Sequence, residues 1–125
     1  MKLACVIHRF GPDVAGGSEE HCRQIALQLA ERHDVTVLTT CARDHVTWRN
    51  EYPAGEARLG PLRLRRFPVT RKRSLHRFAD LSEAVFSGGA SLAHQEQWFR
   101  ENGPQVPSLL AYLEAHGREF DRVLF

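Results

Sequence analysis

The first forty residues alternate between strand-like and helix-like patterns, and this order constrains the fold more than any other feature. Residues 3–7 are continuously apolar, as in a strand covered on both faces of a parallel sheet. A glycine-rich stretch, 11–17, follows. Apolar residues then recur at helical spacing: Cys22, Ile25, Ala26, Leu29 and Ala30. Residues 34–40 are rich in β-branched side chains and predict a second strand, so the chain opens with a βαβ unit.

The rest of the chain predicts two more strands and three helices. Residues 41–60 read as irregular, and the alternation over 62–67 predicts a strand with one solvated face, hence an edge strand. The helices are expected over these ranges: 75–86, 92–101 and 107–116. Residues 121–125 predict a last strand. Right-handed crossovers then give an α/β fold, a Rossmann-like doubly wound parallel sheet with strand order 3-2-1-4.

Composition places the chain among ordinary globular proteins. Its formal net charge is +2 and 42% of its residues are hydrophobic, but no apolar run exceeds five residues. Three cysteines without a CxxC pair argue for a reducing compartment, so we expect a cytoplasmic protein. The length suits one domain over residues 1–125. Because the chain finishes on a bare Val-Leu-Phe strand, we expect that domain to be truncated at its C-terminal end.

The stretch 11–18 (Gly-Pro-Asp-Val-Ala-Gly-Gly-Ser) resembles phosphate-binding loops without matching either common one. The spacing is wrong for G-x-G-x-x-G, and Gly17 stands where a P-loop carries its lysine. Paired glycines at a helix N-terminus let backbone amides approach a ligand, where the helix dipole favours negative charge. Gly16 and Gly17 therefore predict a site for a diphosphate or a sugar hydroxyl. The alternative is a tight βα turn with no ligand.

A longer pattern surrounds these glycines. It comprises Val6–Glu20 with its Gly16-Gly17-x-Glu19 motif, Leu27-x-Leu29-Ala30, Arg32–Thr39, Trp48–Pro53, Arg65–Val69 and Phe120–Phe125. This pattern resembles the N-terminal part of retaining glycosyltransferases of the family 4 type. These enzymes have the GT-B architecture, in which two Rossmann-like domains face each other across the active site.

The resemblance implies a function for the chain. It would be the acceptor-side domain of a transferase that uses a nucleotide-sugar donor and a sugar or lipid-linked acceptor, with no metal or cofactor. Gly16 and Gly17 would approach the donor, and Ser18, Glu19 and His8 are further candidate substrate contacts. The family's E-x7-E motif would lie beyond Phe125, so no catalytic residue is expected here and the chain alone should be inactive.

Trp48 and Asn50 are further candidates for acceptor binding. They lie with Tyr52 in a polar loop after the second strand, where aromatic faces beside an amide suit a sugar ring. The alternative is that the aromatic residues anchor this loop to the core.

Residues 57–79 contain eight basic residues and no acidic one. Arg71, Lys72 and Arg73 predict a contact with anionic lipid, which would make the protein peripheral at the inner membrane face. The alternative is a solvated edge strand and loop. A net charge of +2 and few aromatic residues in this stretch argue against nucleic acid.

Other chemistries find little support. The only close Cys/His pairs are Cys41 with His45 and His21 with Cys22, so no metal site is expected. No G-x-S-x-G nucleophile motif is present. Two alternatives to the transferase remain: a non-catalytic α/β module that binds phosphate or a nucleotide, and a protein-interaction domain that uses the basic edge.

Overall fold

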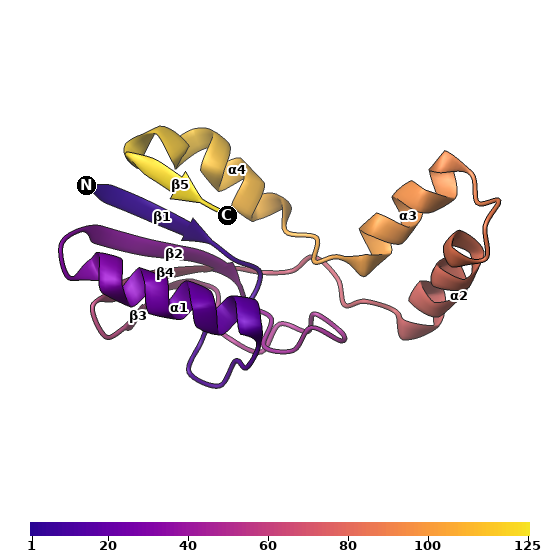
Figure 1. Ribbon diagram of the computed structural model, residues 1–125, viewed down its shortest axis with the longest axis horizontal. Coiled ribbons are helices and arrows are strands. Elements are labelled where there is room, and N and C mark those ends of the chain that lie inside the picture. Colours follow the sequence, from indigo (N-terminus) through magenta and orange to yellow (C-terminus); the bar gives the residue numbers. More distant parts are fainter.

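The computed structural model describes all 125 residues and has one five-stranded sheet with helices on both faces (Figure 1). The strands are β1 (Lys2–Val6), β2 (Asp34–Thr40), β3 (Gly55–Leu59), β4 (Leu62–Phe67) and β5 (Arg122–Leu124). The helices are α1 (Gly17–Ala30), α2 (Leu75–Phe86), α3 (Leu92–Asn102) and α4 (Pro107–His116), with a short 3₁₀ turn η1 (Gly117–Glu119). None of the helices combines the length and the apolar character that a membrane-crossing helix needs.

The sheet is mixed and mostly parallel, with strand order β3-β4-β2-β1-β5. The four strands expected from the sequence keep their predicted order and direction: β4, β2, β1 and β5 are parallel neighbours. The fold is therefore Rossmann-like in a broad sense, and the chain reverses its direction of travel across the sheet at β1.

The predicted order 3-2-1-4 lacked one strand. Residues 55–59, expected to be irregular, form β3, which pairs antiparallel with β4 across a two-residue turn. Gly60 has φ 58 at the first position of that turn, where hairpin turns need a positive φ. The prediction that 62–67 is an edge strand is therefore wrong, because β4 is internal and β3 forms the edge.

Two cores lie on opposite faces of the sheet. The residues of the α1 side are Leu3, Cys5, Phe10, Ala26, Val35, Val37, Leu62 and Leu64. On the other side, α4 packs Leu109, Tyr112 and Leu113 against a smaller core of Ala4, Leu38 and Phe67. Successive strand residues serve alternate faces, which is why the continuously apolar β1 contributes to both.

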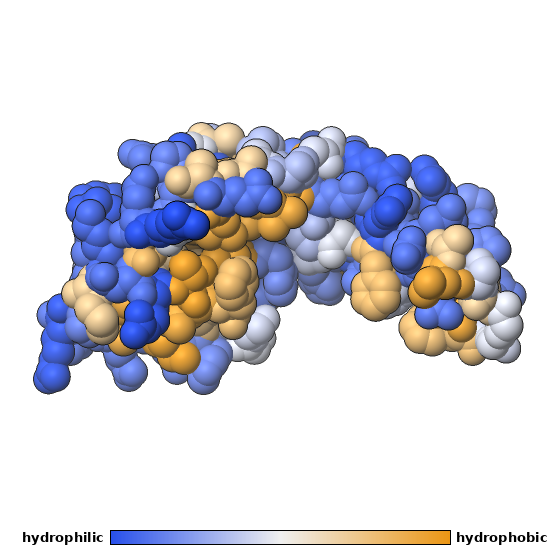
Figure 2. All heavy atoms as spheres, turned by 90° about the horizontal axis from the view of Figure 1, so that it is seen from above, coloured by the Kyte–Doolittle hydropathy of each residue, from blue (hydrophilic) through white to orange (hydrophobic).

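Helices α2 and α3 form an antiparallel hairpin that projects away from the sheet (Figure 1). Trp98 of α3 packs against Phe78 of α2, with ring centroids 5.6 Å apart, and its indole nitrogen donates to Ser82 Oγ at 2.8 Å. We call residues 75–102 the arm. The space-filling view shows the molecule as an arch, with the sheet at one end and the arm at the other (Figure 2).

Helix α1 begins at Gly17 with Gly16 at the N-cap, and Ser18 lies in its first turn. At the end of α4, Gly117 has φ −58 and the chain continues into η1.

Candidate functional site

The residues singled out around the first loop meet at the carboxyl end of β1. Strand β1 ends at Val6, the chain crosses the top of the sheet as loop 7–16, and α1 starts at Gly17. This is the end of a parallel sheet at which open α/β folds bind ligands, next to the strand where the topology reverses. The fold therefore presents His8 and residues 16–19 at the expected place.

A buried ion pair organises this loop. Arg9 Nη2 donates to Glu19 Oε1 at 2.6 Å, and both side chains are almost entirely buried. Arg9 also donates to the backbone oxygens of Arg43 at 3.2 Å and Ala15 at 3.3 Å. Arg9 thus ties the loop, the start of α1 and the segment after β2 together.

Glu19 is held in its charged form. Burial alone raises the pKa of this carboxyl, but hydrogen bonds from its own backbone amide, from Ser18 and from Arg9 outweigh burial, and the pKa is lowered. Ser18 Oγ donates to Glu19 Oε2 at 2.9 Å. An ionised carboxylate at the first turn of α1 also interacts favourably with the helix dipole.

The two glycines have different roles. A Cβ on Gly16 would lie 2.1 Å from Glu19 Oε2 and 3.1 Å from Arg9 Nη2, so the ion pair requires glycine at this position. A Cβ on Gly17 would meet no atom within 4 Å. Both glycines and Ser18 are exposed. The amides of Gly17 and Ser18 donate no hydrogen bond within the protein, because the first turn of a helix has no acceptor for them.

His8 contacts the same first turn of α1 through Glu19. Its Nε2 atom is 3.2 Å from Glu19 Oε1, and 44% of its side chain is exposed. Its ring meets Trp48 edge to face, with centroids 5.5 Å apart. His8 is therefore oriented by two neighbours and still accessible to a ligand.

Trp48 and Asn50 make anchoring contacts. The buried Trp48 indole donates to the Asn102 carbonyl at 2.6 Å. The Asn50 side chain donates to the Val69 carbonyl and accepts from the Val69 amide, both at 2.8 Å. These bonds hold loop 41–52 against distant segments, as the anchoring alternative expects. A contact of Trp48 and Asn50 with an acceptor stays a prediction.

Among the three basic residues expected to meet a membrane, only Lys72 lacks an intramolecular partner. Arg71 pairs with the buried Glu101 at 2.8 Å. Arg73 donates to His45 O at 3.0 Å, Val46 O at 3.2 Å and Asn102 Oδ1 at 2.9 Å, and it also contacts the Asn102 carbonyl. The contact with anionic lipid stays a prediction. Two of the three basic side chains, Arg71 and Arg73, are already bound to partners within the protein.

Two arginines, Arg9 and Arg66, hold the loop in place and were not among the predicted site residues. The available signal for Arg9 was a basic residue two positions after the apolar run 3–7. Arg66 is buried beneath the loop, where it donates to the Phe10 carbonyl at 3.1 Å and lies 4.3 Å from the centre of the Tyr52 ring. Burial lowers the pKa of Arg66. Both arginines support the loop through hydrogen bonds to its backbone oxygens.

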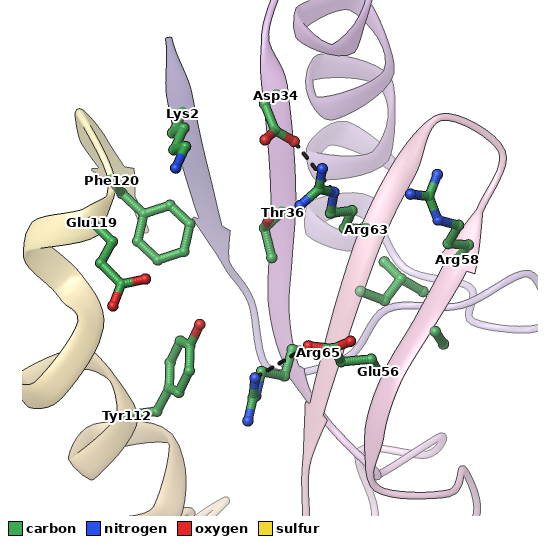
Figure 3. Close-up of a pocket in the computed structure, with 12 residues that line it drawn as sticks. Lys2, Asp34, Thr36, Glu56, Arg58, Arg63, Arg65, Tyr112, Glu119 and Phe120 are labelled. Atoms are coloured by element: carbon green, nitrogen blue, oxygen red, sulfur yellow. Dashed lines mark hydrogen bonds and ion pairs between the residues drawn. The ribbon is translucent and has the colours of Figure 1, made fainter.

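A separate groove of about 650 Å³ lies between α4 and the β3–β4 hairpin and shares no residue with the site (Figure 3). Most of its charges are compensated by neighbours. Arg63 lies 3.5 Å from Asp34, and Arg65 lies 3.4 Å from Glu56 and stacks over a tyrosine ring. No three His, Cys, Asp or Glu side chains gather where they could hold a metal ion.

The chain matches no family model, no curated protein and no solved structure.

Proposed function

We propose that this chain is the acceptor-side domain of a nucleotide-sugar-dependent glycosyltransferase. One observation carries the proposal: the unpartnered amides of Gly17 and Ser18 lie in the first turn of α1, and the half-exposed His8 contacts Glu19 of that same turn, at the carboxyl end of β1. The likeness of Val6–Glu20 and Arg32–Thr39 to family 4 glycosyltransferases supports the same function. In this proposal a second domain of the GT-B type supplies the donor site, and this chain alone is inactive.

The site residues take separate roles in this proposal. The amides of Gly17 and Ser18, at the positive end of the helix dipole, donate hydrogen bonds to an oxygen of the donor diphosphate or of the transferred sugar. His8 contacts a sugar hydroxyl. Glu19 does not contact substrate, because its oxygens are already used by Arg9, His8 and Ser18; it positions those groups.

A second candidate is a non-catalytic module that binds a phosphate or a nucleotide. The same unpartnered amides favour it, because they recognise an anion whatever is attached to it. The two candidates differ in whether the sugar contributes to binding. A transferase domain gains affinity from the sugar through His8, whereas a phosphate module does not.

Titration of the isotopically labelled chain, followed by NMR, tests the proposal. The probes are UDP-glucose, GDP-mannose, UDP and inorganic phosphate. We expect one nucleotide sugar to shift the amides of residues 16–19, with a dissociation constant in the millimolar range because only one domain is present. Equal binding of UDP and its sugar would favour the phosphate module, and shifts confined to other residues would overturn both.

Gly17→Ala sharpens this experiment. Its new methyl group would enter open space at the N-terminus of α1, where the ligand is proposed to bind, so we expect about tenfold weaker binding with the fold intact. His21→Ala, one turn further along α1 and exposed, is the matched control and should bind normally. Unchanged binding by Gly17→Ala would remove the helix terminus from the site.

A further inference from the structure

The arm carries an apolar surface that nothing in the chain covers. Four large apolar side chains on its two helices are between 52% and 74% exposed: Leu75, Phe86, Leu92 and Phe99. Figure 2 shows apolar residues gathered on one side of the arm. Exposed apolar patches of this kind mark interaction surfaces.

Helical spacing places these residues on one face. Leu75 and Phe86 are eleven residues apart, close to three turns of α2, and Leu92 and Phe99 are seven apart, close to two turns of α3. The two stripes adjoin, because the Trp98 ring lies 5.7 Å from that of Phe86 and 5.1 Å from that of Phe99. The face therefore spans both helices.

The exposed charges of the arm are segregated along its length. Its exposed basic residues Arg77 and Arg100 lie at the end attached to the sheet. The exposed acidic residues Asp80, Glu83 and Glu96 lie from the middle of the arm towards its tip. These exposed charges sum to −1, so an anionic bilayer is not attracted to the arm as a whole, while a second arm laid head to tail places the acidic part of each arm beside the basic end of the other.

We propose that two copies of this chain associate through their arms, antiparallel about a two-fold axis, as a four-helix bundle. Two-fold pairing suits a self-complementary patch, and two helical hairpins stacked face to face cover the four apolar side chains of each. Each helix is only about 18 Å long. The interface is therefore small, and we expect a dissociation constant in the micromolar range.

Sedimentation velocity of the full chain between about 1 and 300 µM tests this association. We expect a shift from monomer to dimer with rising concentration. Phe86→Glu and Phe99→Glu should each keep the chain monomeric, because a charge would enter the paired face. Phe125→Glu is the control: Phe125 is 92% exposed but lies outside the arm, so its replacement should leave the dimer intact. Dimers that survive both arm variants would overturn the proposal.

A charge exchange tests the antiparallel arrangement. Glu96→Arg and Arg100→Glu should each weaken the dimer, and the two together should restore it, because each residue then again meets the opposite charge in the partner arm. Single exchanges without effect would overturn the head-to-tail pairing.

Flotation with phosphatidylcholine–phosphatidylglycerol vesicles addresses the competing occupant of this surface. We expect no binding that depends on Phe86 or Phe99. A chain that stays monomeric at every concentration and binds these vesicles through Phe86 would overturn the proposal in favour of a membrane.

Discussion

Arg9 and Glu19, ten residues apart in the chain, form a buried ion pair with 2.6 Å between Nη2 and Oε1. One residue follows the first strand and the other lies in the first turn of the first helix. The pair closes the loop between them and fixes where the exposed residues 16–18 lie. The accessible part of the site is therefore supported by a charge pair that a ligand does not reach.

Glu19→Gln should be strongly destabilising. The amide keeps the shape of the side chain but removes its charge, leaving the buried Arg9 uncompensated, which costs about 3 kcal/mol. Its neighbour supplies the control: Glu20 pairs with Arg23 at the surface, and Glu20→Gln should cost less than 1 kcal/mol. Urea unfolding of both variants checks the difference. Equal losses would mean that the buried pair contributes no more than a surface pair.

The stability of the protein should fall in acid partly through Glu19. Its pKa in the folded protein lies below the ordinary value of 4.5, so the unfolded chain takes up this proton first. The contribution of Glu19 is therefore complete above about pH 4.5 and is lost as the pH falls through the folded pKa. The difference in unfolding free energy between the wild type and Glu19→Gln should shrink from about pH 7 to about pH 3. A constant difference would contradict the lowered pKa.

The sequence predicted the βαβ unit and the strand order because those features depend on short-range patterns. The alternation of 62–67 also predicted one solvated face, and this holds only in part: Arg63 on that face is exposed, whereas Phe67 on the same face is buried against α4. The alternation did not reveal that Arg63 pairs with Asp34 and that Arg65 pairs with Glu56, on the two flanking strands. These ion pairs allow β4 to lie inside the sheet. Strand β3 was missed because Gly-Glu-Ala-Arg-Leu has little intrinsic strand preference, and pairing with β4 imposes its conformation.

The candidate site shows the same limit. His8 and Gly16–Glu19 could be placed together because one short loop joins them. The partners of Trp48 and Asn50 lie 54 and 19 residues away, so their anchoring bonds were not predictable from local sequence. Arg9 was missed because its importance depends on a counter-ion that only the folded loop brings close.

Two neighbouring glycine variants should behave differently. Gly16→Ala places a methyl group against the Glu19 carboxylate and should cost about 2 kcal/mol, because the ion pair must shift. Gly17→Ala meets open space and should leave stability unchanged or raise it by roughly 0.5 kcal/mol. Thermal unfolding of the two variants side by side checks this contrast. A stable Gly16→Ala protein would show that Glu19 tolerates displacement.

Arg73 should control how firmly the arm is attached. Its guanidinium donates to backbone oxygens of His45, Val46 and Asn102, and it lies 5.3 Å from the centre of the Trp48 ring. Lysine keeps the charge but cannot reproduce this fork of donors, so Arg73→Lys should cost about 2 kcal/mol. Hydrogen exchange should accelerate at residues 70–74 and 101–105, where the arm joins the sheet.

Lys72→Ala is the matched control for Arg73→Lys, because Lys72 is exposed and has no partner in the chain. It should leave both stability and hydrogen exchange unchanged. In the sequence, Lys72 and Arg73 are equivalent members of one basic cluster. In the structure, Arg73 attaches the arm to the rest of the chain, whereas Lys72 has no partner and is free to bind an external anion. If Lys72→Ala loosened the arm as much as Arg73→Lys did, the cluster would act through its charge, and the directed hydrogen bonds of Arg73 would not be what holds the arm.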